Sequence, residues 1–179
     1  MILAVTGTPG TGKTAVSRAV AEELDYRYVD VNEVVGQADV TTEEDLQRGA
    51  TAVAVDSLID VLQSDLDDDT VLDGHLSHHY PADLTVVLRC QPAELRERLQ
   101  GKGWNEEKVQ ENVAAERVDV ILQEAVAARD RVAEIDTTER DPDHVAAVIA
   151  DAVASGTVPD RLQPGTVSWP VTEHSDENG

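Results

Sequence analysis

The 179-residue sequence contains no phenylalanine, one cysteine and three lysines. Without phenylalanine, a packed core must be built from Val, Leu, Ile and Ala. The lone Cys90 excludes an internal disulfide and fits the reducing cytoplasm, and we expect it to be a small, partly buried residue rather than a reactive thiol. No apolar run approaches the roughly 20 residues of a membrane span, and the first residues are typical of a strand, not of a secretory signal. We therefore expect one cytoplasmic domain.

Basic residues are also scarce, because 14 Lys and Arg stand against 36 Asp and Glu, for a net charge of -22. The acidic residues are spread through amphipathic segments, which favours a domain adapted to high salt, where self-repulsion is screened. The lack of a broad basic patch disfavours direct, sequence-specific binding of nucleic acid. A short basic partner protein would be attracted instead. Because adaptation to salt accounts for the acidic surface, we do not expect most surface carboxylates to take part in catalysis.

Apolar runs alternate with helical patterns along the chain. Five runs are strand-like, at residues 1–6, 26–31, 70–74, 83–89 and 131–136. Helices are predicted over residues 13–24, 53–66, 92–101, 105 to about 129, and 141–154. Strands that alternate with helices predict an α/β fold with a parallel sheet, in which ligands collect at the carboxyl ends of the strands. Residues 32–52 are polar and poorly periodic, and residues 155–179 predict an extended tail that Trp169 pins to the body.

The run from Gly7 to Thr14, GTPGTGKT, matches the phosphate-binding pattern G-x-x-x-x-G-K-[ST] at every defined position, between a strand and a helix. Its glycines, which include Gly10 and Gly12, allow backbone N–H groups to point at phosphate oxygens, and the helix N-terminus adds partial positive charge. We expect Lys13 to reach the β- and γ-phosphates. The Thr14 hydroxyl is expected to bind Mg²⁺, and the N–H of Ala15 to face the α-phosphate. The motif therefore predicts a bound nucleoside triphosphate with Mg²⁺, and by itself it does not distinguish a kinase from an ATPase or a GTP-binding switch.

An acidic residue and a histidine follow the third strand, in the run VLDGH. Asp73 stands where a P-loop fold needs a carboxylate to hold the water shell of Mg²⁺. His75 lies at the same strand end and is a candidate to orient water or the attacking phosphate oxygen. Three of the five histidines fall in the run HLSHH, which also suggests a transition-metal site. Because no cysteine or second cluster supports such a site, the interpretation of His78 and His79 as ordinary loop residues is favoured.

Three runs, TGTPGTGKT, LDGH and RLQGKGWNEEKVQENVAAE, together resemble the nuclear-type adenylate kinase, often called adenylate kinase isoenzyme six, and its archaeal counterparts. The similarity extends from Met1 to about Ala154. The resemblance implies a three-layer P-loop NTPase fold with a five-stranded parallel sheet and a kinase domain over residues 1–154. Two mobile inserts are implied, a monophosphate-binding insert at residues 30–52 and a short lid at residues 101–111. Residues 155–179 would form a tail outside the kinase domain.

The resemblance also implies roles for individual residues. The ATP-binding loop would comprise Gly10, Gly12, Lys13, Thr14 and Ala15, and the Asp-x-His element used for hydrolysis would comprise Asp73 and His75. Lys102 stands where the family usually has a lid arginine that meets ATP, and lysine keeps the charge but loses the bidentate fork. Arg98, one helical turn earlier, is a candidate to share that catalytic role. Arg89 and Arg48 are further candidates for contact with phosphates.

Three functions remain open from the sequence. The resemblance implies phosphoryl transfer from ATP to AMP or another nucleoside monophosphate, together with ATP hydrolysis. It also implies a role in late maturation of the small ribosomal subunit and its 16S rRNA, through transient binding of a ribosomal protein of the uS11 type. In that second interpretation the protein acts mainly as an ATP-gated assembly factor. The third function is phosphorylation of another small molecule, such as shikimate or a nucleoside.

Overall fold

The computed structural model describes residues 1–37, 59–60, 62, 66 and 68–169. Its sheet has five parallel strands in the order β2-β3-β1-β4-β5. The strands are β1 (Ile2–Gly7), β2 (Arg27–Asp30), β3 (Thr70–Asp73), β4 (Leu84–Arg89) and β5 (Val132–Asp136). All five predicted strands are present, and the predicted α/β P-loop fold is confirmed.

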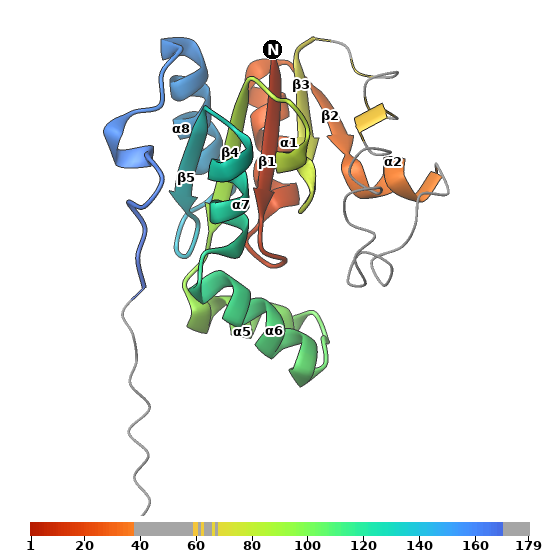
Figure 1. Cartoon of the computed structure of the whole chain (residues 1–179), viewed down its shortest axis with the longest axis vertical. Helices are drawn as coiled ribbons and strands as arrows, with labels where there is room; N and C mark the ends of the chain where they lie inside the picture. The colour runs from red at the N-terminus through yellow and green to blue at the C-terminus, as the bar shows by residue number, and fades with distance from the viewer. Residues whose placement is uncertain (38–58, 61, 63–65, 67, 170–179) are drawn as a thin grey trace, which may run out of the picture.

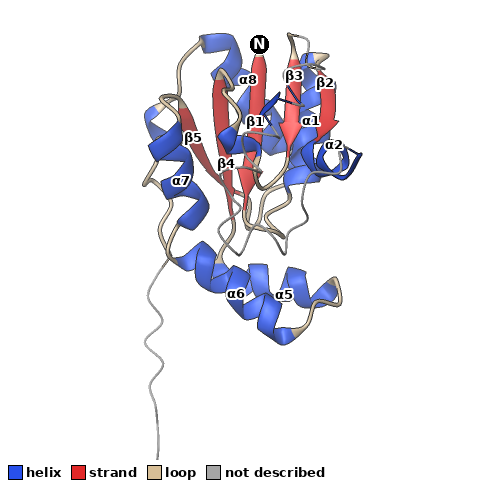
Figure 2. Ribbon diagram, turned by 45° about the vertical axis from the view of Figure 1, so that its right-hand side comes forward, coloured by secondary structure: helices blue, strands red, loops and turns tan. Residues whose placement is uncertain are grey.

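Helices cover both faces of the sheet and extend beyond one end of it (Figure 1, Figure 2). The helices are α1 (Lys13–Leu24), α2 (Val31–Gln37), α5 (Pro92–Gly101), α6 (Glu106–Arg117), α7 (Val120–Ala128) and α8 (Pro142–Ser155), with 3-10 turns η2 (Ser77–His79) and η3 (Asp160–Leu162). Helices α1 and α8 pack on one face, and α7 packs on the other. Helices α5 and α6 lie beyond the carboxyl ends of the strands (Figure 1). The site must therefore lie between these ends and the α5–α6 pair.

The core is aliphatic, as the absence of phenylalanine requires. Its largest cluster joins β1, β4 and β5 to α1 and α8 through buried residues such as Leu3, Val86 and Ile149. A separate cluster holds α5 against α6, and Cys90 belongs to it with no exposed surface. Burial raises the pKa of the Cys90 thiol to about 11, so the thiol is protonated at neutral pH. Cys90 is thus a packing residue, as predicted.

The predicted helix from residue 105 to about 129 is in fact two helices, α6 and α7. Asn105 caps the start of α6, because its side chain accepts a hydrogen bond from the backbone N–H of Lys108 at 2.8 Å. The break lies at Asp119, whose backbone is left-handed with φ 57°. Its carboxylate pairs with Arg89 at the end of β4. The chain thus turns at Asp119, and α7 packs back against β4 and β5.

Two further segments differ from the sequence prediction. Helix α2 begins directly after β2, where a poorly periodic segment was expected, and the Asp30 carboxylate accepts hydrogen bonds from the N–H groups of Asn32 and Glu33 at its start. The tail also contains the turn η3, and Leu162 is buried in the main core. Most of the predicted helix at residues 53–66, residues 38–52 of the predicted monophosphate insert, and Arg48 lie outside the described residues.

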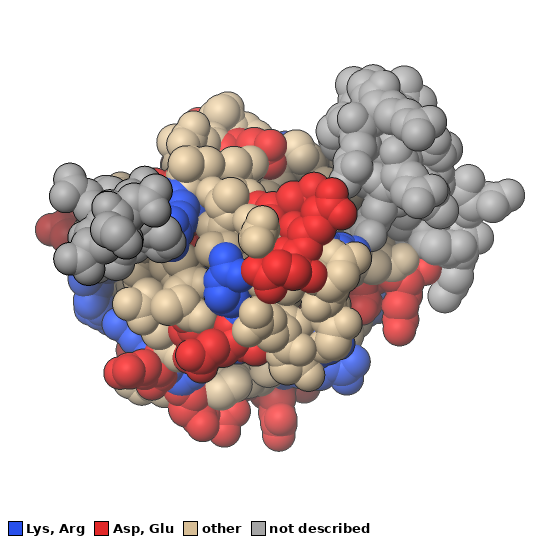
Figure 3. Space-filling model, turned by 90° about the horizontal axis from the view of Figure 1, so that it is seen from below, with Lys and Arg blue, Asp and Glu red and all other residues tan. Residues whose placement is uncertain are grey.

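The surface beyond the strand ends carries charges of both signs. Seen from below, acidic side chains form several groups across this face, and basic side chains lie between them (Figure 3). Within the described part of the chain, no helix is both long and apolar enough to cross a bilayer.

Candidate functional site

The glycine-rich loop connects β1 to α1 at the carboxyl end of the central strand. Gly12 caps α1 with φ 94°, a left-handed conformation that side chains rarely adopt. At Gly10, a Cβ would approach the side chains of Leu95 and Leu99 to 2.8 and 3.0 Å. The loop is therefore seated against α5, and both glycines are required for its path.

Lys13 turns back over this loop. Its Nζ donates hydrogen bonds to the carbonyl oxygens of Gly7 at 2.8 Å and Thr8 at 3.2 Å. Burial lowers its pKa to about 8; nearby Asp73 acts in the opposite direction, and Lys102 adds to the lowering. These three charges, from α1, β3 and the turn after α5, thus lie within electrostatic reach of one another. Thr14 and Ala15 are exposed in the first turn of α1, as a phosphate-facing helix start requires.

Asp73 ends β3, the strand beside β1, and is buried. Its Oδ2 accepts a hydrogen bond from the hydroxyl of Tyr28 at 2.9 Å, which orients the carboxylate. A carboxylate and the Thr14 hydroxyl both supply oxygen ligands, the type that Mg²⁺ prefers. The Thr14 hydroxyl in the first turn of α1 and the Asp73 carboxylate at the end of β3 therefore fit a magnesium ion by ligand type.

The two predicted cations of the α5 region lie in different environments. Arg98 is held between the P-loop and the start of α8, where it donates to the carbonyl oxygens of Gly10 at 3.5 Å, Thr137 at 3.2 Å and Thr138 at 2.7 Å. Its Nε also pairs with Glu94 at 2.8 Å. Lys102, by contrast, is exposed at the C-cap of α5. Arg98 thus contacts the P-loop, whereas the Lys102 side chain is exposed to solvent.

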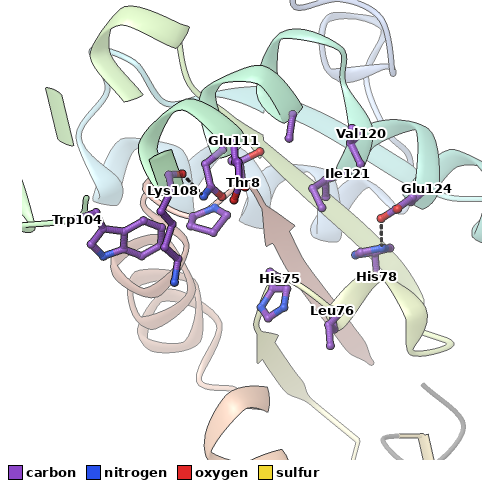
Figure 4. A pocket seen from close by; sticks show the side chains of 13 residues that line it. Thr8, His75, Leu76, His78, Trp104, Lys108, Glu111, Val120, Ile121 and Glu124 are labelled. Atoms are coloured by element: carbon purple, nitrogen blue, oxygen red, sulfur yellow. Dashed lines mark hydrogen bonds and ion pairs between the residues drawn. The ribbon is translucent and has the colours of Figure 1, made fainter. Parts of the chain in front are cut away.

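A cavity of about 420 Å³ opens beside the P-loop. His75 projects into it from the segment after β3. Trp104, in the turn before α6, and Lys108, on α6, line another side of it (Figure 4). The remaining lining comes from the P-loop, η2, α6 and α7, at Thr8, Pro9, Leu76, His78, Glu111, Asn112, Ala115, Val120, Ile121 and Glu124. The cavity joins the predicted hydrolysis residue His75 to the predicted lid, two segments that the sequence alone does not place together.

The two histidines of η2 are not ordinary loop residues. His78 is fully buried, and burial lowers its pKa to about 3. Its ring Nδ1 lies 3.1 Å from the Thr6 hydroxyl and its Nε2 lies 3.3 Å from an oxygen of Glu124 on α7. His79 is partly buried, and its ring packs on that of His78 with centroids 4.1 Å apart. Sequence reasoning missed Glu124 because it lies on a different helix, 46 residues beyond His78.

Arg89 is not a phosphate-binding residue in this structure. It is 1% exposed, and its guanidinium pairs with Glu116 at 2.8 Å and with Glu134 and Asp119. Burial alone would lower the pKa of Arg89, but Glu116 and Asp119 outweigh it and raise the pKa. Glu116 also accepts a hydrogen bond from the Thr8 hydroxyl of the P-loop. Neither glutamate was predicted, because each follows a helical or strand pattern without any local motif.

The same network reaches the tail. Glu134 accepts hydrogen bonds through Oε2 from the backbone N–H groups of Gly165 at 2.7 Å, Thr166 at 3.0 Å and Val167 at 3.3 Å. The guanidinium carbon of Arg89 lies over the Trp169 ring, 5.8 Å from the centroid of that ring. The tail is thus attached to the sheet beside β5, and Trp169 contacts the body as predicted.

Comparisons with known proteins support a nucleotide kinase. Residues 3–119 match the family model described as AAA domain. A protein of Pyrococcus abyssi described as "Putative adenylate kinase" is 41% identical over 170 residues, which cover 94% of this chain and 91% of that protein. A protein of Natronomonas pharaonis with the same description is 42% identical over 176 residues, which cover 97% and 99%. Matches of this length continue past Ala154 into the tail.

Solved structures share the fold at lower identity. A shikimate kinase from Acinetobacter baumannii in complex with shikimate has a TM-score of 0.63 at 16% identity, and the match covers 88% of this chain and 95% of that chain. A deoxyadenosine kinase from M. mycoides has a TM-score of 0.59 at 17% identity, with 87% and 100% covered. At these identities the structures show the fold, a P-loop kinase-like α/β sheet, and not the substrate.

Proposed function

Because this chain belongs to the adenylate kinase-like family of P-loop proteins, we propose that it transfers the γ-phosphoryl group of ATP reversibly to a nucleoside monophosphate, with AMP as the first candidate. The observation that carries the proposal is the placement of charged groups around the P-loop. Lys13 lies over the loop after β1, the buried carboxylate of Asp73 ends the neighbouring strand β3, and Lys102 stands at the C-cap of α5. Phosphoryl transfer needs this kind of alignment and charge neutralisation.

Each site residue has a role in this proposal. The backbone N–H groups from Gly10 to Ala15 cradle the phosphates of ATP, and Lys13 leaves its carbonyl partners to neutralise charge on the γ-phosphoryl group. Lys102 adds a second cation when the α5–α6 turn closes over the site. Arg98 supports the catalytic geometry by holding Gly10. Thr14 and Asp73 hold Mg²⁺, which neutralises phosphate charge when it is bound.

The decisive experiment is an acceptor panel. ADP formation is measured from ATP with each nucleoside monophosphate, in high salt to match the acidic composition, and with shikimate and deoxyadenosine as alternative acceptors. We expect AMP to support the fastest transfer. If the folded protein forms ADP no faster with any monophosphate than with ATP alone, the proposal is contradicted. Phosphorylation of shikimate or deoxyadenosine alone would identify a different small-molecule kinase.

We further propose that water attacks ATP when no monophosphate is bound, with His75 at the cavity positioning it. His75→Ala should then lower ATP hydrolysis by about 100-fold and AMP phosphorylation much less, since positioned acid–base groups contribute about 10²–10⁴-fold. The two initial rates are compared in the same preparation, and His144→Ala, an exposed histidine on α8, is the matched control. Equal losses of both activities would remove the separate role of His75.

A second proposed function follows from the excess of acidic residues, which form several groups on the surface beyond the strand ends (Figure 3). This face is complementary to a basic protein, and the partner we propose is a small-subunit ribosomal protein of the uS11 type, bound transiently during ribosome assembly. Pull-down with that protein in the presence and absence of ATP tests it. Nucleotide-dependent capture would support an ATP-gated assembly factor, whereas absent or nucleotide-independent capture would count against it.

A further inference from the structure

Three side chains from two elements meet at the edge of the cavity, away from the P-loop. The ligand atoms of His78, His79 and Glu124 all lie within 4.8 Å of one another. His78 is completely buried, and its ring points at the Glu124 carboxylate (Figure 4). This cluster takes no part in the proposed phosphoryl transfer, so its arrangement calls for a separate explanation.

Hydrogen bonding assigns the tautomer of His78. The Thr6 hydroxyl oxygen lies 3.1 Å from the carbonyl oxygen of His75 and 3.1 Å from Nδ1 of His78. A carbonyl only accepts, so the single hydroxyl hydrogen goes to His75. The Thr6 oxygen must then accept from Nδ1–H. This places the proton on Nδ1 of His78 and leaves a lone pair on Nε2, the arrangement found in histidines that bind metals.

The lone pair of His78 Nε2 faces a second acceptor. Glu124 Oε2 is 3.3 Å away, and within the described residues Nε2 has no hydrogen-bond partner. Two acceptors in this position repel each other unless a cation lies between them. Two ligands of a tetrahedral zinc ion, each about 2.0–2.1 Å from the metal, are separated by about 3.4 Å. The 3.3 Å between His78 Nε2 and Glu124 Oε2 fits this ligand-to-ligand distance.

We propose that His78, His79 and Glu124 bind a divalent transition metal, with Zn²⁺ as the best fit. Two imidazoles and one carboxylate match Zn²⁺ and not Mg²⁺, which prefers oxygen ligands throughout. Arg129 holds the backbone of both histidines, because its guanidinium donates to the carbonyl oxygens of His78 and His79. Its positive charge opposes the metal, so the site binds more weakly than a four-ligand structural zinc site.

The position of the site indicates its consequence. His78 and Glu124 both line the cavity that contains His75, and three protein ligands leave a coordination position open. A bound metal joins η2, directly after the Asp73–His75 segment, to α7. Metal binding therefore stabilises the wall of the cavity, whatever the acceptor of the phosphoryl group.

The test is a zinc titration of the full-length, metal-free protein against a chromophoric chelator. Excess Mg²⁺ and high salt are present, so that the P-loop site and the acidic surface do not compete. We expect one Zn²⁺ per chain, and at least a tenfold loss of affinity in each of His79→Ala and Glu124→Gln. The matched controls are His144→Ala, an exposed histidine, and Glu111→Gln, an exposed glutamate that lines the same cavity. Both should bind as the parent protein does.

Two further readouts make the result decisive. Zn²⁺ should raise the melting temperature of the parent protein and of both controls, but not of Glu124→Gln, because a ligand that binds only the folded state stabilises it. Co²⁺ should give visible absorption that is lost in the same variant. Unchanged affinity in His79→Ala and Glu124→Gln would overturn the proposal. So would the absence of stoichiometric binding, which would show that a proton alone separates His78 from Glu124.

Discussion

Replacement of Lys13 by alanine is expected to lower kcat/KM for ADP formation from ATP and AMP by at least about 1,000-fold. The reason is that positive charge aimed at the transferred phosphoryl group is worth about 10³–10⁵-fold in comparable enzymes. Among the described residues, the hydrogen bonds of the Lys13 side chain go to the carbonyl oxygens of Gly7 and Thr8. Its removal should leave the sheet and α1 intact, which circular dichroism and thermal unfolding verify on the same preparation.

The pH dependence of ATP binding provides an independent check of this role. Burial lowers the pKa of Lys13 to about 8 in the ligand-free protein. Phosphates favour the charged lysine, so binding takes up a proton once the pH exceeds this pKa, and ATP affinity should fall as the pH rises above about 8. Lys13→Ala should bind ATP weakly and without this decline. A variant that kept the same pH profile would show that another group titrates.

The sheet could be predicted from the sequence because strands and the P-loop are recognised from residues that are neighbours in the chain. Strands β1, β3, β4 and β5 are short, mainly buried runs, whereas in β2 only Val29 is buried. The P-loop motif specifies the β1–α1 connection by itself. Asp73 could be assigned to the strand ends because parallel strands all finish at the same edge. The caps at Asn105 and Asp141 were also predictable, since a cap needs only residues two or three positions away.

What the sequence did not show depends on residues far apart in the chain. At the break between α6 and α7, Asp119 pairs with Arg89, which lies 30 positions earlier. Glu124 and His78 likewise come together only when α7 packs over η2. The periodicity of strands and helices reports only on neighbouring residues and cannot reveal contacts between distant segments. The buried ion pairs of Arg89 and the cluster of His78, His79 and Glu124 were therefore not identified from the sequence.

Arg89→Met is expected to cause the largest loss of stability, about 3–5 kcal/mol in the free energy of unfolding. The substitution keeps a similar volume but leaves the carboxylates of Glu116 and Glu134, 2% and 1% exposed, without their common cation. Urea unfolding at constant salt gives the measurement. The matched control is Arg96→Met, because Arg96 pairs with Glu106 at the surface and exposed pairs contribute about 0–1 kcal/mol.

A compensating variant separates charge from packing in this network. If the unpaired carboxylates cause the loss, Arg89→Met combined with Glu116→Gln and Glu134→Gln should recover part of the stability, since neutral groups cost less to bury than charges. No recovery would indicate that the shape of the guanidinium matters more than its charge.

The Arg89 network also links the P-loop to the tail, and the Arg89→Met variant tests this link. Glu116 holds Thr8 of the P-loop, and Glu134 holds the tail at Gly165–Val167. Without Arg89, both carboxylates lose the partner that orients them. In conditions where Arg89→Met remains folded, ATP affinity should therefore fall, and limited proteolysis should cut between residues 163 and 169 faster than in the parent protein. Arg96→Met should change neither property. Faster cleavage with unaltered ATP affinity would show that Arg89 secures the tail but does not position the P-loop.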